Sequence, residues 1–307
     1  MREAVSLAER VAGTDANVLV TGESGAGKDA LAFHIHSKSN RATQSLVKID
    51  CATLPSGLLE AELFGYERGA FTGASEEKPG RLEAAHRGTL ILDEIAYLTN
   101  DAQAKLLRVI ETREFERLGG RRTIKVDARL IALTNVDLSD AVKRENFRED
   151  LYYRLNVVHI KVPALRERPE DLGELVQAFV ATYSAKHGCP VDGVSADALA
   201  LLREYEFPGN VRELANTIER AVIISPGKRI EVDHLPEPIR ATVRVQRRRK
   251  QPLSLAEIEA EYVEEILAAS KGNKTEAARV LGISRKNLYE KLARRKKESG
   301  EGMKAEG

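Results

Sequence analysis

Residues 18–29 read VLVTGESGAGKD, which is an apolar strand followed by a glycine-rich turn and the start of a helix. Gly22, Gly27 and Lys28 complete the pattern G-x-x-x-x-G-K, which is typical of phosphate-binding loops. Glycines let the backbone turn tightly, so that its N–H groups face phosphate oxygens. The helix N-terminus adds a favourable dipole, and the lysine reaches the β- and γ-phosphates. The stretch therefore predicts a phosphate loop formed by Gly22, Glu23, Ser24, Gly25, Ala26, Gly27, Lys28 and Asp29.

The last position of this loop is unusual, because Asp29 stands where a Ser or Thr commonly offers a hydroxyl to Mg²⁺. Taken alone, the loop leaves a coincidental glycine turn as an alternative. A second element, GTLILDEI at residues 88–95, is an apolar strand that ends in Asp93 and Glu94. The alternative here is a pair of exposed strand-end acids. Together the two elements predict a nucleoside triphosphatase whose catalytic carboxylates are Asp93, which holds Mg²⁺, and Glu94, which polarises the attacking water.

Short apolar segments rich in Val, Ile and Leu alternate with helical patterns through the first two thirds of the chain. Such runs are typical of strands buried on both faces, and their alternation with helices predicts an α/β domain with a parallel sheet. The expected strands cover residues 17–21, 46–50, 89–93, 128–134 and 157–162, and a helix is expected over 101–111. After Pro163 the pattern predicts a small helical subdomain, with helices over residues 170–187, 195–205 and 210–225.

The whole chain of 307 residues has 48 basic and 47 acidic residues, 42% apolar residues and two cysteines. These values are typical of a globular protein with a sizeable core. They argue against disorder, a disulfide scaffold and a membrane span, so we expect a cytoplasmic protein. The near-zero total charge hides an uneven distribution of charge along the chain. Residues 241–307 hold 16 Lys and Arg against 10 Asp and Glu, while the remainder holds 32 against 37. An acidic body with a basic end indicates nucleic-acid contact.

Residues 62–74 read ELFGYERGAFTGA and place three aromatic residues among glycines and small residues. By composition this is a buried turn or, with Gly69 and Gly73 as hinges, a mobile loop that presents Phe71. The segment resembles the GAFTGA loop of the bacterial sigma-54-dependent transcriptional activators (NtrC-like), a branch of the AAA+ ATPases. The likeness covers nearly the whole chain, because further family motifs resemble GESGAGKD, GTLILDEI, FREDLYYRLNV, VPALRERPEDL and FPGNVREL. In that family an acidic residue follows the lysine of the phosphate loop.

The resemblance implies a ring, usually a hexamer, with ATP and Mg²⁺ bound between neighbouring subunits. It makes Asn135 the sensor of the γ-phosphate and Arg212 a second sensor on the helical lid. Without it, Asn135 is a strand-end cap, and Arg212 is an arginine near a helix N-terminus that pairs with Glu213 or another neighbouring residue. Arg148 and Arg154 match the arginines that reach the neighbouring subunit's ATP, where a guanidinium suits the charge on the γ-phosphoryl oxygens. The alternative for each of these two is a surface salt bridge.

The resemblance also assigns a partner to the GAFTGA loop, which consists of Gly69, Ala70, Phe71, Thr72, Gly73 and Ala74. In the family this loop grips sigma-54. ATP turnover moves it, so that the closed RNA polymerase–promoter complex is remodelled and the DNA opens. We therefore expect Phe71 and Thr72 to contact sigma-54, and we expect ATP hydrolysis to drive a conformational change in that partner.

The sequence departs from the family pattern in two places. Asp50, in VKIDC, stands where the family usually has an Asn that is thought to hold the catalytic glutamate away from water. An Asp cannot donate an amide hydrogen bond and would repel Glu94 if both were ionised. Either the switch works differently, basal hydrolysis is less restrained, or the exchange has no consequence. The chain also starts close to its first strand, without the usual upstream stretch or a sensory domain. A fragment and regulation by a partner in trans both remain open.

Residues 272–295, GNKTEAARVLGISRKNLYEKLARR, have the layout of a helix-turn-helix and resemble the Fis-type DNA-binding domain. Thr275 is expected to cap the first helix, Gly282 to make the turn and Ser284 to cap the second helix. An apolar stripe over residues 253–270 predicts core or a dimer seam. Early residues of the second helix are placed for base edges and later ones for phosphates, the alternative being a solvated basic helix end. The expected DNA-binding residues are Ser284, Arg285, Lys286, Asn287, Lys291, Arg294 and Arg295.

The predicted organisation is an AAA+ α/β core over residues 1–165, a helical lid over 166–240, a basic linker over 241–252, a helix-turn-helix domain over 253–297 and a disordered tail over 298–307. The hypothesis is an ATP-driven activator of sigma-54 RNA polymerase. It binds double-stranded upstream DNA as a homo-oligomer, a hexamer with dimer contacts through the C-terminal domain. The alternatives are an AAA+ remodelling ATPase outside transcription and a repressor with a relict ATPase fold. The complete loop motif argues against the first, and Lys28, Asp93, Glu94 and Arg154 argue against the second.

Overall fold

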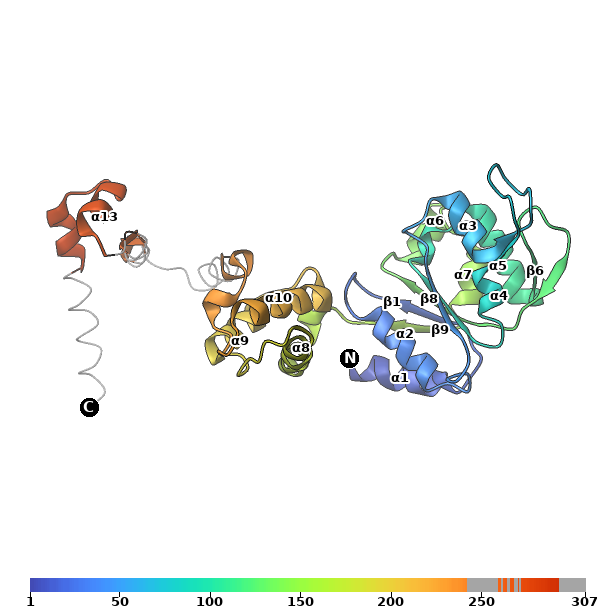
Figure 1. Cartoon of the computed structure of the whole chain (residues 1–307), viewed down its shortest axis with the longest axis horizontal. Helices are drawn as coiled ribbons and strands as arrows, with labels where there is room; N and C mark the ends of the chain where they lie inside the picture. The colour runs from blue at the N-terminus through green and yellow to red at the C-terminus, as the bar shows by residue number, and fades with distance from the viewer. Residues whose placement is uncertain (242–258, 261, 264–265, 268–269, 271, 293–307) are drawn as a thin grey trace. The chain divides into compact units, whose positions relative to one another are not determined.

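The structure is a computed structural model and describes residues 1–241, 259–260, 262–263, 266–267, 270 and 272–292 (Figure 1). The chain divides into two compact units, Met1–Pro236 and Glu237–Gly307. The α/β sheet and the helical lid both belong to the first unit. The tail and most of the basic linker lie outside the described residues. The predicted domain boundaries stay predictions.

Five parallel strands form the central sheet in the order β2–β5–β8–β1–β9. All five lie within the ranges expected from the sequence, which confirms the predicted parallel α/β fold. Their bounds are β1 Val18–Thr21, β2 Leu46–Asp50, β5 Thr89–Asp93, β8 Arg129–Thr134 and β9 Val158–Lys161. Because the strands are parallel, the phosphate loop after β1 and the acids at the end of β5 meet at one edge of the sheet.

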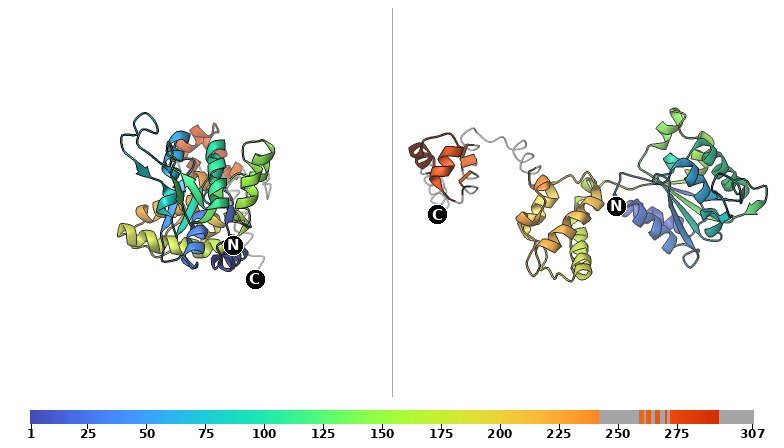
Figure 2. Two further views of the ribbon diagram at one scale, coloured as in Figure 1. Left: turned by 90° about the vertical axis from the view of Figure 1, so that its right-hand side faces the viewer. Right: turned by 45° about the horizontal axis from the view of Figure 1, so that its top comes forward.

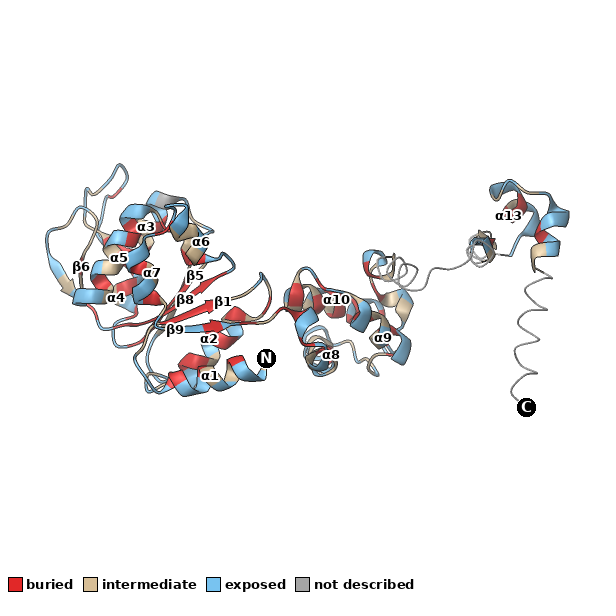
Figure 3. Cartoon of the chain, turned by 180° about the vertical axis from the view of Figure 1, so that it is seen from behind, coloured by how far each residue is buried: buried red, intermediate tan, exposed pale blue. Residues whose placement is uncertain are grey.

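Side chains of the strands alternate between two apolar clusters, because successive residues of a strand point to opposite faces. Leu90 and Leu92 of β5 pack in the first cluster, and Ile91 packs in the second. Helices cover both faces of the sheet, and the strands are buried between them (Figures 2 and 3). The second cluster includes residues of α1 Arg2–Ala12 and α2 Lys28–Ser37. The first cluster includes residues of five helices: α3 Ser56–Phe64, α4 Arg81–Ala84, α5 Asn100–Thr112, α6 Leu138–Lys143 and α7 Glu149–Leu155.

Two short antiparallel ladders were not expected from the sequence. β3 Gly65–Tyr66 pairs with β4 Lys78–Pro79, and β6 Glu114–Glu116 pairs with β7 Thr123–Lys125. Strands of two or three residues are too short to show the alternation that identifies a strand in a sequence. The first ladder closes the base of the segment that carries the GAFTGA loop.

The lid is helical, as predicted. Among all the described residues, no helix is long and apolar enough to cross a membrane. The helix expected from residue 170 begins two residues later, because the preceding turn, which opens at Pro169, is a 3₁₀ helix. Ser195 caps α9 through its hydroxyl, which accepts the Ala198 N–H. The elements are η2 Leu165–Glu167, η3 Pro169–Asp171, α8 Leu172–His187, α9 Ala196–Glu204, α10 Asn210–Ile224 and η4 Val232–His234.

The second unit contains α13 Lys274–Val280 and a second helical stretch over residues 285–292. The prediction that Thr275 caps the first helix is wrong. Asn273 takes that place, and its side chain accepts the backbone N–H groups of Thr275 and Glu276. Asn273 has extended dihedrals, as a cap requires, whereas Thr275 lies inside the helix. The predicted cap of the second helix is confirmed, because Ser284 Oγ accepts the Asn287 N–H at 3.2 Å.

Candidate functional site

The phosphate loop connects β1 to α2, and Gly27 is the N-cap of α2 with φ +107°. The first turn of α2 presents backbone N–H groups that a helix leaves without intrahelical acceptors, which suits an anion. Gly25 is required by close packing as well as by its φ of +73°, since a Cβ there would lie 2.5 Å from the Gly209 carbonyl oxygen. The loop is thus pressed against the start of the lid helix α10, which leaves no space for a side chain at position 25.

Lys28 is 7% exposed and folds back over its own loop. Its ammonium donates to the carbonyl oxygens of Gly22 at 2.9 Å and Glu23 at 3.2 Å and lies 3.9 Å from Glu94 Oε1. Burial lowers the pKa of Lys28, against the opposite effect of Glu94 and Asp93. A buried ammonium whose contacts are two carbonyl oxygens and a carboxylate at 3.9 Å is suited to exchange these contacts for stronger ones to phosphate oxygens.

Glu94 follows β5 in the left-handed region, with φ +53° and ψ +49°. This conformation is uncommon for a residue with a side chain. It brings Glu94 Oε2 within 3.2 Å of the Asn135 backbone N–H, at the end of β8. The contact to Asn135 is made through its backbone, whereas the side chain that the resemblance makes a γ-phosphate sensor is exposed. The predicted catalytic acid, sensor and loop lysine therefore lie together.

Asp93, the predicted metal ligand, contacts a residue that sequence reasoning missed. Its Oδ2 lies 2.7 Å from the ammonium of Lys48 on β2, which also lies 2.5 Å from Asp29 Oδ1. Asp93 and Glu94 are mostly buried. Their carboxylate oxygens are hard ligands of the kind that Mg²⁺ prefers. The signal for Lys48 was a charged residue between the apolar residues Val47 and Ile49 of β2.

Asp50 ends β2 and pairs in register with Asp93. Its Oδ1 accepts the Ala52 backbone N–H at 2.9 Å, so the carboxylate makes a turn after the strand. Asn could accept the same hydrogen bond, which is compatible with a conservative exchange. The predicted effect of Asp50 on the switch stays a prediction.

The lid contacts the phosphate loop through the first turn of α10. Arg212 Nη1 donates to Ser24 Oγ at 3.0 Å, which places it beside the phosphate loop, and its nucleotide role stays a prediction. Asn210, fully buried with φ +52°, donates to the Ser24 carbonyl oxygen and to Glu23, while its Oδ1 accepts the Leu165 N–H. The Val211 N–H donates to the Gly25 carbonyl oxygen. Sequence reasoning named Arg212 alone, although the motif FPGNVREL contains all three residues.

Two arginines near the start of the lid also hold the phosphate loop. Arg166 forms a two-pronged ion pair with Glu23, and with Asn210 it lowers the pKa of Glu23 to about 2. Arg168 is buried and donates to the Ala26 carbonyl oxygen at 2.6 Å. Neither residue was predicted, although both lie in the motif VPALRERPEDL. The loop that carries Lys28 is thus tied to the lid at four successive residues, from Glu23 to Ala26.

Arg154 lies at the opposite edge of the sheet from the phosphate loop. Its carbonyl oxygen accepts the side-chain N–H of Asn17, just before β1, whereas the loop leaves the far end of β1. Four strand residues span about 13 Å. The Arg154 guanidinium is 60% exposed and pairs with Glu111 at 3.1 Å.

Arg148 is the N-cap residue of α7 and forms an exposed pair with Asp150. Within the described part of the chain, neither Arg148 nor Arg154 contacts residues 22–29. Both make the surface salt bridges that were the alternative to a role at a neighbour's ATP.

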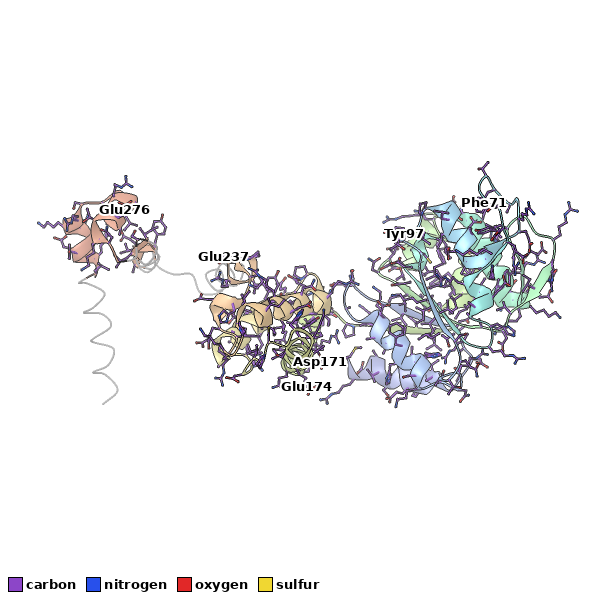
Figure 4. All side chains as sticks on the ribbon, viewed as in Figure 1. Phe71, Tyr97, Asp171, Glu174, Glu237 and Glu276 are labelled. Atoms are coloured by element: carbon purple, nitrogen blue, oxygen red, sulfur yellow. The ribbon has the colours of Figure 1, made fainter. Side chains whose placement is uncertain are left out.

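The GAFTGA loop projects from the α/β domain, with Phe71 on it (Figure 4). Phe71 is 41% exposed and its ring makes an edge contact with Tyr66, while Thr72 is exposed. Ala74 is buried, and its carbonyl oxygen accepts the Gly69 N–H at 2.8 Å, which closes the loop. Of the six residues predicted to contact sigma-54, Phe71 and Thr72 in the middle of the loop are thus exposed. Ala74, the last of the six, is buried and closes the loop.

An arginine that was not predicted ties both legs of this loop to the neighbouring hairpin. Arg117 follows β6 and pairs with Glu83 at 2.8 Å, with Glu67 before the loop at 3.2 Å and with Glu77 after it at 3.3 Å. Gly119 of the same hairpin packs on Ala70, where a Cβ would come within 2.8 Å. The base of the GAFTGA loop is therefore joined to the β6–β7 hairpin.

In the second unit, Arg285, Lys286 and Asn287 are exposed at the start of the second helical stretch. Val263, Ala277, Ala278 and Leu288 are buried beneath them and form a small core. Lys291 pairs with Glu259 at 2.6 Å, which favours an intramolecular role for this residue. Arg294 and Arg295 lie outside the described residues.

Comparison with known proteins identifies the class. Residues 1–161 match the sigma-54 interaction domain, residues 166–252 the AAA+ ATPase lid domain, and residues 254–294 the bacterial regulatory protein, Fis family. The chain belongs to the sigma-54 interaction domain family of AAA+ ATPases and carries the lid and a Fis-family helix-turn-helix. This confirms the family and the fold that the sequence predicted.

Individual relatives align with most of this chain. The chain is 44% identical to the transcriptional regulatory protein FlbD of Caulobacter vibrioides, over 95% of this chain and 68% of that protein. It is 45% identical to the regulatory protein AtoC of Escherichia coli, over 92% and 63%. The crystal structure of NtrX from Brucella abortus in complex with ATP matches at 36% identity and a TM-score of 0.71, over 95% of this chain and 67% of that one. A second NtrX structure, in complex with ADP, has a TM-score of 0.74 at 35% identity over the same shares of the two chains. The chain thus spans about two thirds of the length of these relatives.

Proposed function

We propose that this chain is a cytoplasmic, ATP-driven and DNA-binding activator of sigma-54 RNA polymerase. The observation that carries the proposal is the convergence of Lys28, Asp93 and Glu94 at one edge of the sheet, in a chain that also presents the GAFTGA loop. The first feature supports ATP hydrolysis, and the second supports its use on sigma-54. The exposed basic start of the second helical stretch supports upstream double-stranded DNA as the further partner.

In this proposal the residues of the site divide the work of hydrolysis. Residues 22–29, with Lys28 among them, would bind the phosphates of ATP, and Asp93 would hold Mg²⁺, which would supply neutralisation of the phosphate charge. Glu94 accepts a hydrogen bond from a water and orients it for attack on the γ-phosphorus. Arg212 is held beside the phosphate loop by its bond to Ser24 and is placed to follow the nucleotide state from the lid.

The proposed site is completed by a second copy of the chain in a ring, most simply a hexamer. Arg154 supports this arrangement, because it lies on the edge of the sheet away from its own phosphate loop and is exposed. A guanidinium from a neighbour stabilises the charge that spreads over the γ-phosphoryl oxygens in the transition state. The C-terminal domain would add dimer contacts.

Arg154→Ala is therefore expected to reduce ATP hydrolysis per subunit by about a thousandfold, the value typical of an arginine supplied by a neighbour. Hydrolysis per subunit in the unmodified protein should rise cooperatively with protein concentration. Steady-state hydrolysis over a concentration series measures both effects. Arg108→Ala, which removes another exposed arginine that pairs with an acid, is the control. A concentration-independent rate together with an active Arg154→Ala would show that each subunit hydrolyses ATP alone.

For the second unit, Arg285→Ala is expected to weaken binding to the cognate DNA site by about 1–3 kcal/mol, and binding to random DNA by much less. Arg285 is exposed at the helix start, where side chains reach base edges. Binding isotherms on both DNAs at one salt concentration measure the difference, with Arg279→Ala, an exposed arginine of α13, as the control. Equal losses on both DNAs would assign Arg285 to phosphate contact.

The whole proposal is tested by mixing the protein with sigma-54 and an ATP transition-state analogue. A stable complex that requires the analogue is expected. Its absence, with ATP hydrolysis intact, would favour an AAA+ remodelling ATPase outside transcription. Absence of hydrolysis at every protein concentration would favour a DNA-binding protein with a relict ATPase fold.

A further inference from the structure

Lys48 joins two carboxylates from different elements at the candidate nucleotide site. Its ammonium lies 2.5 Å from Asp29 Oδ1, in the first turn of α2, and 2.7 Å from Asp93 Oδ2, at the end of β5. One of these acids follows the lysine of the phosphate loop, and the other is the proposed metal ligand. Lys48 thus occupies the place between them where a cation would be expected.

The position of Lys48 follows from the alternation and register of β2. Lys48 pairs in parallel register with Ile91, which packs in the cluster that α1 and α2 cover. Leu46, two residues earlier, packs against the same cluster, whereas Val47 and Ile49 belong to the opposite face. The strand therefore directs Lys48 toward α2, whose first turn carries Asp29.

The acids around Lys48 need a positive charge. Asp29 and Asp93 share the ammonium of Lys48, and Glu94 follows Asp93 directly, while the ammonium of Lys28 donates to the loop carbonyl oxygens and lies 3.9 Å from Glu94. Burial alone would lower the pKa of Lys48, but the hydrogen bonds to Asp29 and Asp93 outweigh burial and raise it. Lys48 is partly exposed, at 31%, so it is accessible to exchange with ions from solution.

We propose that Lys48 is an internal counter-cation that positions Asp93 in the absence of nucleotide and yields it to Mg²⁺ when the nucleotide binds. Lys48 keeps its contact with Asp29 in both states. This contact holds the Asp29 carboxylate away from the phosphates, although Asp29 occupies the position where a Ser or Thr would contact the metal. The inference rests on the proposed nucleotide function, but it concerns a residue to which that function assigns no role.

The exchange makes a specific prediction for the coupling between Mg²⁺ and nucleotide. In the unmodified protein Mg²⁺ must displace Lys48 from Asp93, and without Mg²⁺ the lysine partly offsets the repulsion between nucleotide and carboxylates. Removal of the lysine strengthens ADP binding in the presence of Mg²⁺, because no ammonium has to be displaced. It weakens ADP binding in the absence of Mg²⁺, because the repulsion is no longer offset. In Lys48→Met, the factor by which Mg²⁺ strengthens ADP binding is expected to rise about tenfold.

Titration calorimetry of the full chain with ADP, in excess Mg²⁺ and in excess EDTA, measures this factor. Thermal unfolding with Mg²⁺ alone adds a readout without nucleotide, in which Mg²⁺ should stabilise Lys48→Met more than the unmodified protein. Lys48→Gln keeps a polar group of similar length and serves as the test variant if Lys48→Met does not fold. Lys125→Met, at a lysine that is 85% exposed, is the control.

The outcomes separate this inference from the proposed function. An unmodified protein that binds no ADP under either condition would refute the proposed nucleotide site itself, whereas one whose ADP binding does not respond to Mg²⁺ would refute the exchange. A Mg²⁺-dependent unmodified protein whose factor is unchanged in Lys48→Met and Lys48→Gln would refute only the exchange. Equal weakening of ADP binding with and without Mg²⁺ would likewise make Lys48 a structural tether.

Discussion

Lys28→Ala is expected to reduce ATP hydrolysis by at least about a hundredfold, the size of effect that follows when a charge-stabilising donor is removed from a catalytic site. The ammonium of Lys28 is buried, lies at the start of α2 and is 3.9 Å from Glu94, and residues 22–29 contain no second lysine that could replace it. The substitution should also weaken ATP binding. Phosphate release and nucleotide binding, each measured at a saturating protein concentration, check the two effects.

Lys38→Ala is the matched control for this prediction. Lys38 is the exposed C-cap residue of the same helix, so its removal changes the charge by the same amount and leaves the phosphate loop intact. Hydrolysis in this variant should stay within about twofold of the unmodified protein, as is usual for a surface change. Full turnover by Lys28→Ala would contradict the assignment of residues 22–29 as the phosphate site.

Thr72→Ala is expected to leave ATP hydrolysis nearly unchanged and to reduce open-complex formation at a sigma-54 promoter by at least about tenfold. Such a loss corresponds to about 1.4 kcal/mol of contact free energy. Thr72 is exposed on the projecting loop, so its hydroxyl and methyl groups are available to a partner. Hydrolysis assays and promoter-opening assays on the same preparation measure the two activities separately.

Ser75→Ala removes an exposed hydroxyl three residues further along and is the control for the loop. Promoter opening should persist in this variant. If Thr72→Ala opened the promoter normally, the loop would not be the part that transmits the work of hydrolysis. If Thr72→Ala lost hydrolysis as well, the loop would be coupled to the nucleotide site. The contacts of Arg117 with Glu67 and Glu77 at the base of the loop would then be the candidates for this coupling.

Much of the fold could be predicted because its signals are local. Each strand of the central sheet is a short apolar run, and the predicted ranges contain the observed strands. The β3–β4 and β6–β7 ladders could not be predicted, since two or three residues show no periodicity. The cap of α13 was misassigned from Asn273 to Thr275, because both residue types favour caps and only the backbone dihedrals distinguish them.

The candidate site shows the same division. The phosphate loop, Asp93 and Glu94 lie in continuous motifs, so the sequence alone indicated their chemistry. Lys48, Asn210, Arg166 and Arg117 act through partners far away in the chain, and nothing in their neighbouring residues names those partners.

The sequence by itself determined the class of protein and its fold, and it predicted the order of the parts and the residues of the candidate phosphate site, because these depend on short-range patterns of residue type. Only the tertiary structure decided which charges meet around that site. Parallel strands bring Asp93, Lys48 and the phosphate loop to one edge of the sheet, and the lid adds Asn210 and Arg212. The same packing places Arg154 at the other edge. Contacts between residues so distant in sequence depend on how the strands pair and the helices pack, and that geometry exists only in the folded chain.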